Sequence, residues 1–84
     1  MGNYVVGTIH PFVLGQEILV YIDSQCVQVV ECTLENMNEK VYQLCEKYNI
    51  NKVCFVGGQL YALKFKDELV ANKFGNKHIE VTIR

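Results

Sequence analysis

The residue pair in this chain that most resembles a ligand-binding element is Gly57-Gly58, which separates a short apolar run from a helical stretch. A glycine turn at such a point exposes backbone N–H groups at the positive end of a helix dipole, where they can hold an anion. The pair has no G-x-G-x-x-G pattern, no Walker lysine, and no Ser or Thr to hold a metal. Phosphate binding by Gly57 and Gly58 is therefore the minority interpretation, because glycine also makes such turns for steric reasons alone.

Residues for covalent or acid–base catalysis are scarce. His10 precedes a proline and His78 starts a strand-like stretch, and neither has a nucleophile or carboxylate partner visible in the sequence. The cysteines form no C-x-x-C pair and lie among apolar neighbours, so we expect buried, reduced thiols and a reducing compartment. These are Cys26, Cys32, Cys45 and Cys54. We predict no catalytic residue, no metal site and no cofactor.

Length and composition favour a small folded domain over residues 1–84, since half of the residues are hydrophobic and 20% are charged. The net charge of −1 and the single arginine, Arg84, argue against a nucleic-acid partner, which needs a cationic surface. No secretory signal and no membrane-length apolar stretch is present in the sequence. We expect a cytoplasmic protein with no membrane partner.

Periodicity predicts strands over 4–9, 17–22, 26–32, 52–56 and 78–84, and helices over 34–48 and 60–74. His10-Pro11 should end the first strand, because proline cannot donate to a sheet ladder. Asn49 should end the first helix and Gly75 the second, each in a left-handed conformation. The order βββαβαβ predicts an α/β fold with a mixed five-stranded sheet. Right-handed crossovers would place both helices on the same face of that sheet.

This order of elements resembles the ribonuclease H-like fold, whose first three strands are antiparallel and whose later strands join in parallel. The segment Val56-Gly57-Gly58 is similar to the strand end before a helix in actin- and Hsp70-type domains. The resemblance raises the possibility of a two-metal nuclease, in which the first strand and the end of the fourth supply carboxylates. Here strand 4–9 has no acid and the fourth ends in glycines. The other candidate acids are Asp23, Glu31, Asp67 and Glu68, and we interpret all four as surface charge.

The most informative sequence feature is the sheet face that the helices leave open. Strand alternation predicts an apolar centre with a polar margin, the usual pattern of a partner-binding surface. The predicted interface residues are Tyr4, Val6, Leu19, Tyr21 and Val30; their neighbours on this face are Cys26 and Cys54, with Thr8, Gln28, His78, Glu80 and Thr82. The alternative is that the loop over 11–16 folds across this face.

We therefore expect a small non-catalytic module that binds first to its own copy, as a homo-oligomer, and then to another protein. Its richness in Lys, Asn, Ile and Tyr resembles that of phage or mobile-element accessory or inhibitor proteins. The alternative is a nucleotide or nucleic-acid-binding domain that uses the Gly57-Gly58 turn with Lys52, Lys64 and Lys66.

Overall fold

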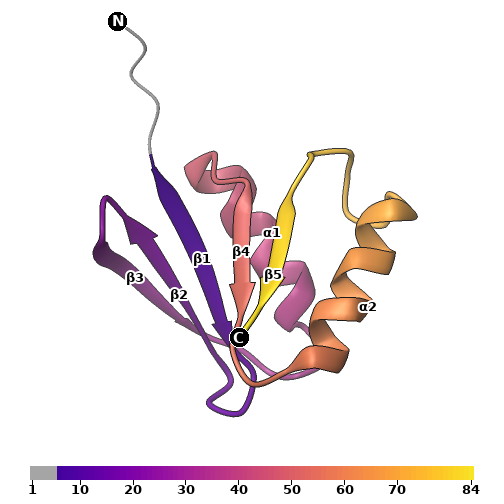
Figure 1. Cartoon of the computed structure of the whole chain (residues 1–84), viewed down its shortest axis with the longest axis horizontal. Coiled ribbons are helices and arrows are strands. Elements are labelled where there is room, and N and C mark those ends of the chain that lie inside the picture. Colours follow the sequence, from indigo (N-terminus) through magenta and orange to yellow (C-terminus); the bar gives the residue numbers. More distant parts are fainter. Residues whose placement is uncertain (1–5) are drawn as a thin grey trace, which may run out of the picture.

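A computed structural model describes residues 6–84. Its elements are β1 (Gly7–Phe12), β2 (Glu17–Ile22), β3 (Gln25–Glu31), α1 (Met37–Tyr48), β4 (Lys52–Phe55), α2 (Gln59–Val70) and β5 (Glu80–Ile83). They form a five-stranded mixed sheet in the order β3-β2-β1-β4-β5, with β1 at the centre (Figure 1). β1, β2 and β3 are antiparallel neighbours, whereas β4 pairs in parallel with β1 and β5 with β4. The expected α/β class and mixed five-stranded sheet are confirmed.

The first strand extends three residues further along the chain than the sequence predicts. β1 runs through Pro11 to Phe12, so the prediction that His10-Pro11 ends it is wrong. Pro11 still accepts a hydrogen bond through its carbonyl from Val56 N–H at 2.9 Å. Its missing N–H affects only the pairing with β4, which is limited to Ile9↔Val53 and a separate Phe12↔Val56 bridge.

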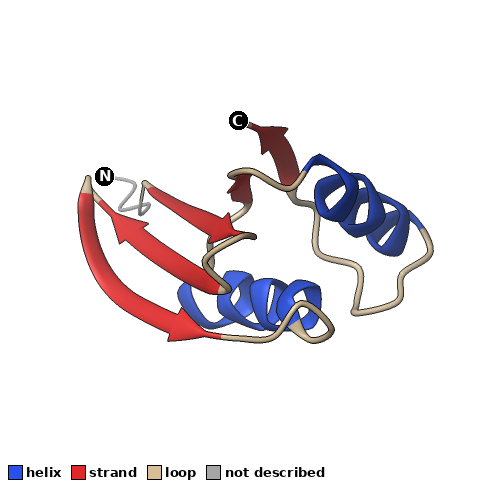
Figure 2. Cartoon of the chain, turned by 90° about the horizontal axis from the view of Figure 1, so that it is seen from below, coloured by secondary structure: helices blue, strands red, loops and turns tan. Residues whose placement is uncertain are grey.

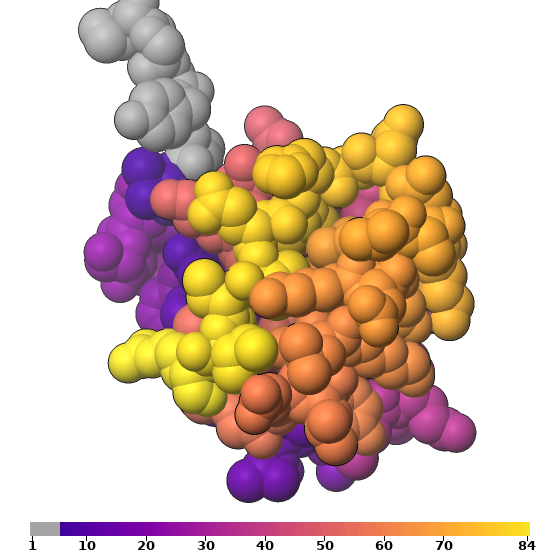
Figure 3. All heavy atoms as spheres, turned by 45° about the vertical axis from the view of Figure 1, so that its right-hand side comes forward, coloured from indigo at the N-terminus to yellow at the C-terminus, as the bar shows by residue number. Residues whose placement is uncertain are grey.

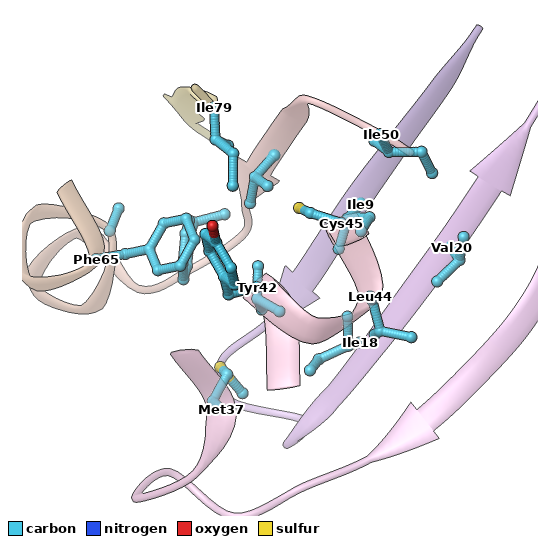
Figure 4. Close-up of a cluster of buried hydrophobic side chains, with 14 of the residues drawn as sticks. Ile9, Ile18, Val20, Met37, Tyr42, Leu44, Cys45, Ile50, Phe65 and Ile79 are labelled. Atoms are coloured by element: carbon cyan, nitrogen blue, oxygen red, sulfur yellow. The ribbon is translucent and has the colours of Figure 1, made fainter. Parts of the chain in front are cut away.

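Both helices lie on one face of the sheet and enclose the core (Figure 2). Alternate residues of β1 and β2, such as Ile9 and Ile18, meet Val41 of α1 on this face, and Phe55 of β4 meets Phe65 of α2; all five are fully buried. Figure 4 shows side chains from the strands and both helices gathered in this cluster. Position 7 needs a glycine, because an added Cβ would come within 2.7 Å of the Ile50 side chain.

The first helix begins three residues later than predicted. Thr33 and Asn36 exchange hydrogen bonds, from Thr33 N–H to Asn36 Oδ1 at 2.9 Å and from Asn36 N–H to Thr33 Oγ1 at 3.2 Å. This closed turn keeps the chain out of the helix until Met37 and leaves Leu34 exposed outside it. The predicted end of this helix is confirmed, because Asn49 is left-handed at φ 55°.

The second helix ends at Val70, and the prediction that it runs to Phe74 with Gly75 as its cap is wrong. Asn72 takes the left-handed conformation at φ 54°. Lys73 N–H then donates to Glu68 O at 2.9 Å and Asn72 N–H to Leu69 O at 3.1 Å, which is a Schellman motif. Gly75 serves another purpose, since a Cβ there would collide with the Tyr42 hydroxyl.

The third strand carries an irregularity that reverses its alternation. Tyr21 pairs with Cys26 but Val20 pairs with Gln28, so Val27 is an additional residue in β3. Gln28 and Val30 consequently face the helices, where Val30 packs against the core and Gln28 accepts a hydrogen bond from the Tyr48 hydroxyl. Their predicted placement on the open face is wrong, because one inserted residue moves the rest of a strand to its other face.

Candidate interaction surface

The face of the sheet opposite the helices carries no other element of the described chain (Figure 2). Half-buried Phe12, Leu19, Tyr21 and Val56 do not pack against the core cluster, which places their side chains on this opposite side. Alternation and pairing assign fifteen residues to it, and we call this set the open face. They are Thr8, His10, Phe12, Glu17, Leu19, Tyr21, Cys26, Val29, Glu31, Lys52, Cys54, Val56, Glu80, Thr82 and Arg84.

Strand pairing arranges the open face in three rows that cross the sheet from β3 to β5. At the end where β1 finishes, the row is Glu31–Glu17–Phe12–Val56–Arg84. The middle row is Val29–Leu19–His10–Cys54–Thr82. The third row is Cys26–Tyr21–Thr8–Lys52–Glu80. The inner strands therefore carry Phe12 and Val56 in the first row, and Leu19 and Cys54 on either side of His10 in the second. Three of the five charged residues lie at the edges; Glu17 and Lys52 lie on the inner strands β2 and β4.

Arg84 follows the last residue of β5 and still belongs to this sheet. Its N–H donates to Phe55 O at 2.8 Å, and its carbonyl accepts from Gly57 N–H at 3.2 Å. These two bonds hold Arg84 beside Val56, as the next parallel partner along the ladder. Because Val81 packs against the core on the helix side, alternation directs the Arg84 side chain to the open face.

His10 lies at the middle of the open face. Its ring contacts the Tyr21 ring edge-on, with 5.1 Å between the centroids. Partial burial, and secondarily the nearby charge of Arg84, lower the pKa of His10 from its usual value. The sheet centre therefore favours a neutral imidazole.

The structure places two of the predicted interface residues, Leu19 and Tyr21, together on the open face. Val6 precedes β1 with 57% of its surface exposed, and its carbonyl accepts from Asp23 N–H at 2.9 Å. Val30 faces the helices, as described above, and Tyr4 lies outside the described residues. The sequence prediction lacks Phe12 because it ends β1 too early, and it lacks Val29 because it misses the bulge; it also leaves out Val56, although the predicted strand 52–56 includes this residue.

The loop after β1 does not fold across the open face as the alternative required. Pro11 and Phe12 belong to the strand, and Val13 is buried in the core cluster. Val13 N–H donates to Val56 O at 3.2 Å, so the loop continues past the end of β4 toward the glycine turn.

The Gly57-Gly58 turn borders an apolar groove of about 350 Å³. Gly57 adopts φ 75° and its N–H is already bonded to Arg84 O, while Gly58 leaves room for the Val13 side chain. The groove contains no lysine or arginine. It is lined by Val13, Leu14, Gln16, Leu34, Gly57, Gly58, Gln59, Leu60 and Tyr61.

The lysines proposed to assist this turn lie elsewhere. Lys52 is on the open face, Lys64 borders a groove between the two helices, and Lys66 borders a groove between α2 and β5. The latter groove, of about 490 Å³, lies on the side of the molecule seen in Figure 3, where α2 (orange) and β5 (yellow) adjoin. It contains Lys66, Lys77 and His78 above an apolar floor that includes Ile79.

A second exposed apolar surface follows the outer side of α2. Leu60, Leu63 and Val70 are 78%, 43% and 85% exposed at helical spacings of three and seven residues. The sequence gives little sign of this surface, because α2 has apolar residues on both its buried and its outer sides.

All four cysteines are free thiols. Cys45 is buried, and burial raises the pKa of its thiol to about 12. Cys26 is exposed and Cys32 only half-buried, so the expectation that every cysteine is buried is wrong for these two. Across residues 6–84, no three or more His, Cys, Asp or Glu side chains gather as a metal site would require. None of the described helices has the length and apolar character to cross a membrane.

Comparison of the chain with protein-family models, with curated proteins and with solved structures finds no match. The function of the open face therefore has to be inferred from its own residues.

Proposed function

We propose that this protein is a non-catalytic protein-binding module that associates with its own copy through the open face. The observation that carries this proposal is the one-sided cover of the sheet: α1 and α2 pack on one face, and the other presents apolar side chains at its centre. A sheet with one covered face is stable when its second face is polar or meets a partner.

The distribution of side chains on the open face supports a protein partner. Phe12 lies on the central strand β1, and Leu19 and Tyr21 lie on the adjacent strand β2, while Glu31 and Glu80 lie on the edge strands. An apolar, aromatic centre within a charged margin is typical of protein interfaces. Tyr21 is the anchor we propose, because an aromatic ring with a polar tip at the centre of an interface is a common hot spot.

The topology also supports the ribonuclease H-like assignment that the order of elements implies. β1, β2 and β3 form an antiparallel meander, and β4 and β5 extend it in parallel on the other side of β1. We propose this fold relationship as a matter of architecture. β1 contributes no carboxylate from Gly7 to Phe12, so the acid that such nucleases place on their first strand has no counterpart in this strand.

The alternative function, nucleotide or nucleic-acid binding at Gly57-Gly58, has less support. The Gly57 N–H is bonded within the chain, the adjoining groove is apolar, and Lys52, Lys64 and Lys66 do not converge on it. A phosphate site at a helix N-terminus needs free N–H donors.

The experiment that tests the proposal is sedimentation velocity over a concentration series, with the parent protein and the Tyr21→Lys variant. We expect the parent to sediment as a concentration-dependent dimer and Tyr21→Lys as a folded monomer, because an ammonium group at the centre of an apolar contact is costly to desolvate. Val70→Lys is the matched control, since it adds the same charge to an exposed apolar residue of α2. A parent that stays monomeric at high micromolar concentration, or equal weakening by both substitutions, would contradict the proposal.

A further inference from the structure

The charges of the open face are distributed unequally between its two edges. In the row at the end of β1, Glu17 and Glu31 are direct partners on β2 and β3, whereas Arg84 stands at the opposite edge beside β4. Like charges directly opposite each other in a strand pair are destabilising. Within the described chain the one ion pair is Lys73–Glu68, so neither Glu17 nor Glu31 has a cation within ion-pair distance there.

Symmetry relates these two edges. β1 is the middle strand of the five, with β2 and β3 on one side and β4 and β5 on the other. A two-fold axis that lies along β1, in the plane between two stacked sheets, would place β3 of each copy over β5 of its partner and β2 over β4. Both copies would keep the same strand direction, so the end row of one would lie over the end row of the other.

We propose that a second copy of this chain docks on the open face with its two-fold axis along β1, so that Arg84 of each copy meets Glu31 and Glu17 of the other. The inference rests on the proposed function and specifies the partner's orientation. Within the end row it matches Glu17 and Glu31 with Arg84 twice in each dimer, as expected of complementary interfaces. Stacked sheets lie about 10 Å apart, a gap that an arginine and a glutamate side chain can close from opposite sides.

The other rows are compatible with the same axis. In the middle row, Leu19 of one copy would lie over Cys54 of the other, and the two His10 rings would meet near the axis. In the third row, Tyr21 would lie over Lys52, a pairing of a ring with a cation. An axis across the strands would instead put Glu31 over the Cys26 region and Arg84 over Glu80, leaving the two paired glutamates without a cation.

The size of the open face predicts a weak dimer. Adjacent strands lie about 4.8 Å apart, and adjacent rows are separated by two residues of about 3.3 Å each. With side chains included, the patch measures roughly 20 by 20 Å, or about 400 Å². This area is below the usual size of about 800 Å² per partner. We expect dissociation in the micromolar range and a strong dependence on ionic strength.

The test is a charge exchange measured by sedimentation velocity. Glu31→Arg and Arg84→Glu, each alone, should weaken the dimer by about tenfold, because each replaces two attractive contacts with two repulsive ones. Both residues are exposed, so the variants should fold, which far-UV circular dichroism will check. The two variants mixed in equal amounts should form a mixed dimer of near-parental affinity, because each contact then joins an arginine to a glutamate.

The outcomes separate the orientation from the underlying function. A parent without any dimer contradicts the proposed function itself. A parental dimer that Tyr21→Lys abolishes, together with no recovery in the mixture of Glu31→Arg with Arg84→Glu, contradicts the two-fold axis along β1. Recovery of Arg84→Glu by Glu80→Arg in the same chain would also overturn this axis, in favour of one across the strands.

Discussion

The packing of α1 on the sheet is the basis for regarding the opposite face as free, and a substitution at Val41 tests this packing directly. Val41 is fully buried at the centre of α1, which contacts β1 and β2. Val41→Ala removes two methyl groups, worth about 0.8 kcal/mol each by transfer from water. The remaining cavity adds about 1 kcal/mol if the surrounding core keeps its shape. We therefore expect the free energy of unfolding to fall by about 2.5 kcal/mol.

Urea denaturation followed by far-UV circular dichroism can resolve this change. With a slope of about 1 kcal/mol per M for a small domain, the midpoint should fall by roughly 2.5 M. That is a large share of a total stability of about 4 to 13 kcal/mol for a chain of 84 residues. Gln43→Ala, at an exposed position of the same helix, is the control and should change stability by no more than about 0.5 kcal/mol. Equal loss from both variants would refute the assignment of the buried side of α1.

Two further predictions concern polar groups. Asn38 is buried between the helices and its side-chain amide donates to Glu68 Oε1 at 3.1 Å. Asn38→Asp would bring two carboxylates together, so urea denaturation should show the free energy of unfolding reduced by about 2 to 4 kcal/mol. Adding Glu68→Gln should recover part of this loss, and no recovery would show that the two side chains do not interact. Folding lowers the pKa of His10 below its unfolded value of 6.5, so its contribution to stability is complete above pH 6.5 and is lost as the pH falls through the folded pKa. In thermal unfolding of dilute protein, the melting temperature should therefore decline less over this pH range in His10→Gln than in the parent. Identical declines would contradict the burial of His10.

The order of elements and the bounds of β2 followed from the sequence because local pattern decides them. Glu17–Ile22 is a glutamate followed by five apolar residues and is bounded by turn residues, and Asn49 followed by apolar Ile50 is a typical helix end. Such features depend on neighbouring residues only. They are therefore visible without knowledge of the tertiary contacts.

The parts that the sequence did not reveal depend on contacts between distant segments. Pro11 remains in β1 because its carbonyl still pairs with Val56, and Gly75 is needed for its contact with Tyr42 rather than to end α2. The additional residue Val27 moved Val30 off the open face, and no residue type near it marks a bulge. The placement of Leu19 and Tyr21 is correct because successive side chains of β2 point to opposite faces of the sheet without interruption. The predicted placement on the open face is thus confirmed for Leu19 and Tyr21 of β2 and wrong for Val30 of the bulged strand β3.

Methyl NMR of the protein at increasing concentration tests self-association through the open face most directly. Leu19, Val29 and Val56 carry methyl groups on this face, whereas Leu60, Leu63 and Val70 carry exposed methyl groups on α2. We expect the resonances of the first set to shift progressively from low to high micromolar concentration while those of the second set stay constant. Shifts confined to the α2 methyl groups, or no shift at any concentration, would contradict binding through the open face.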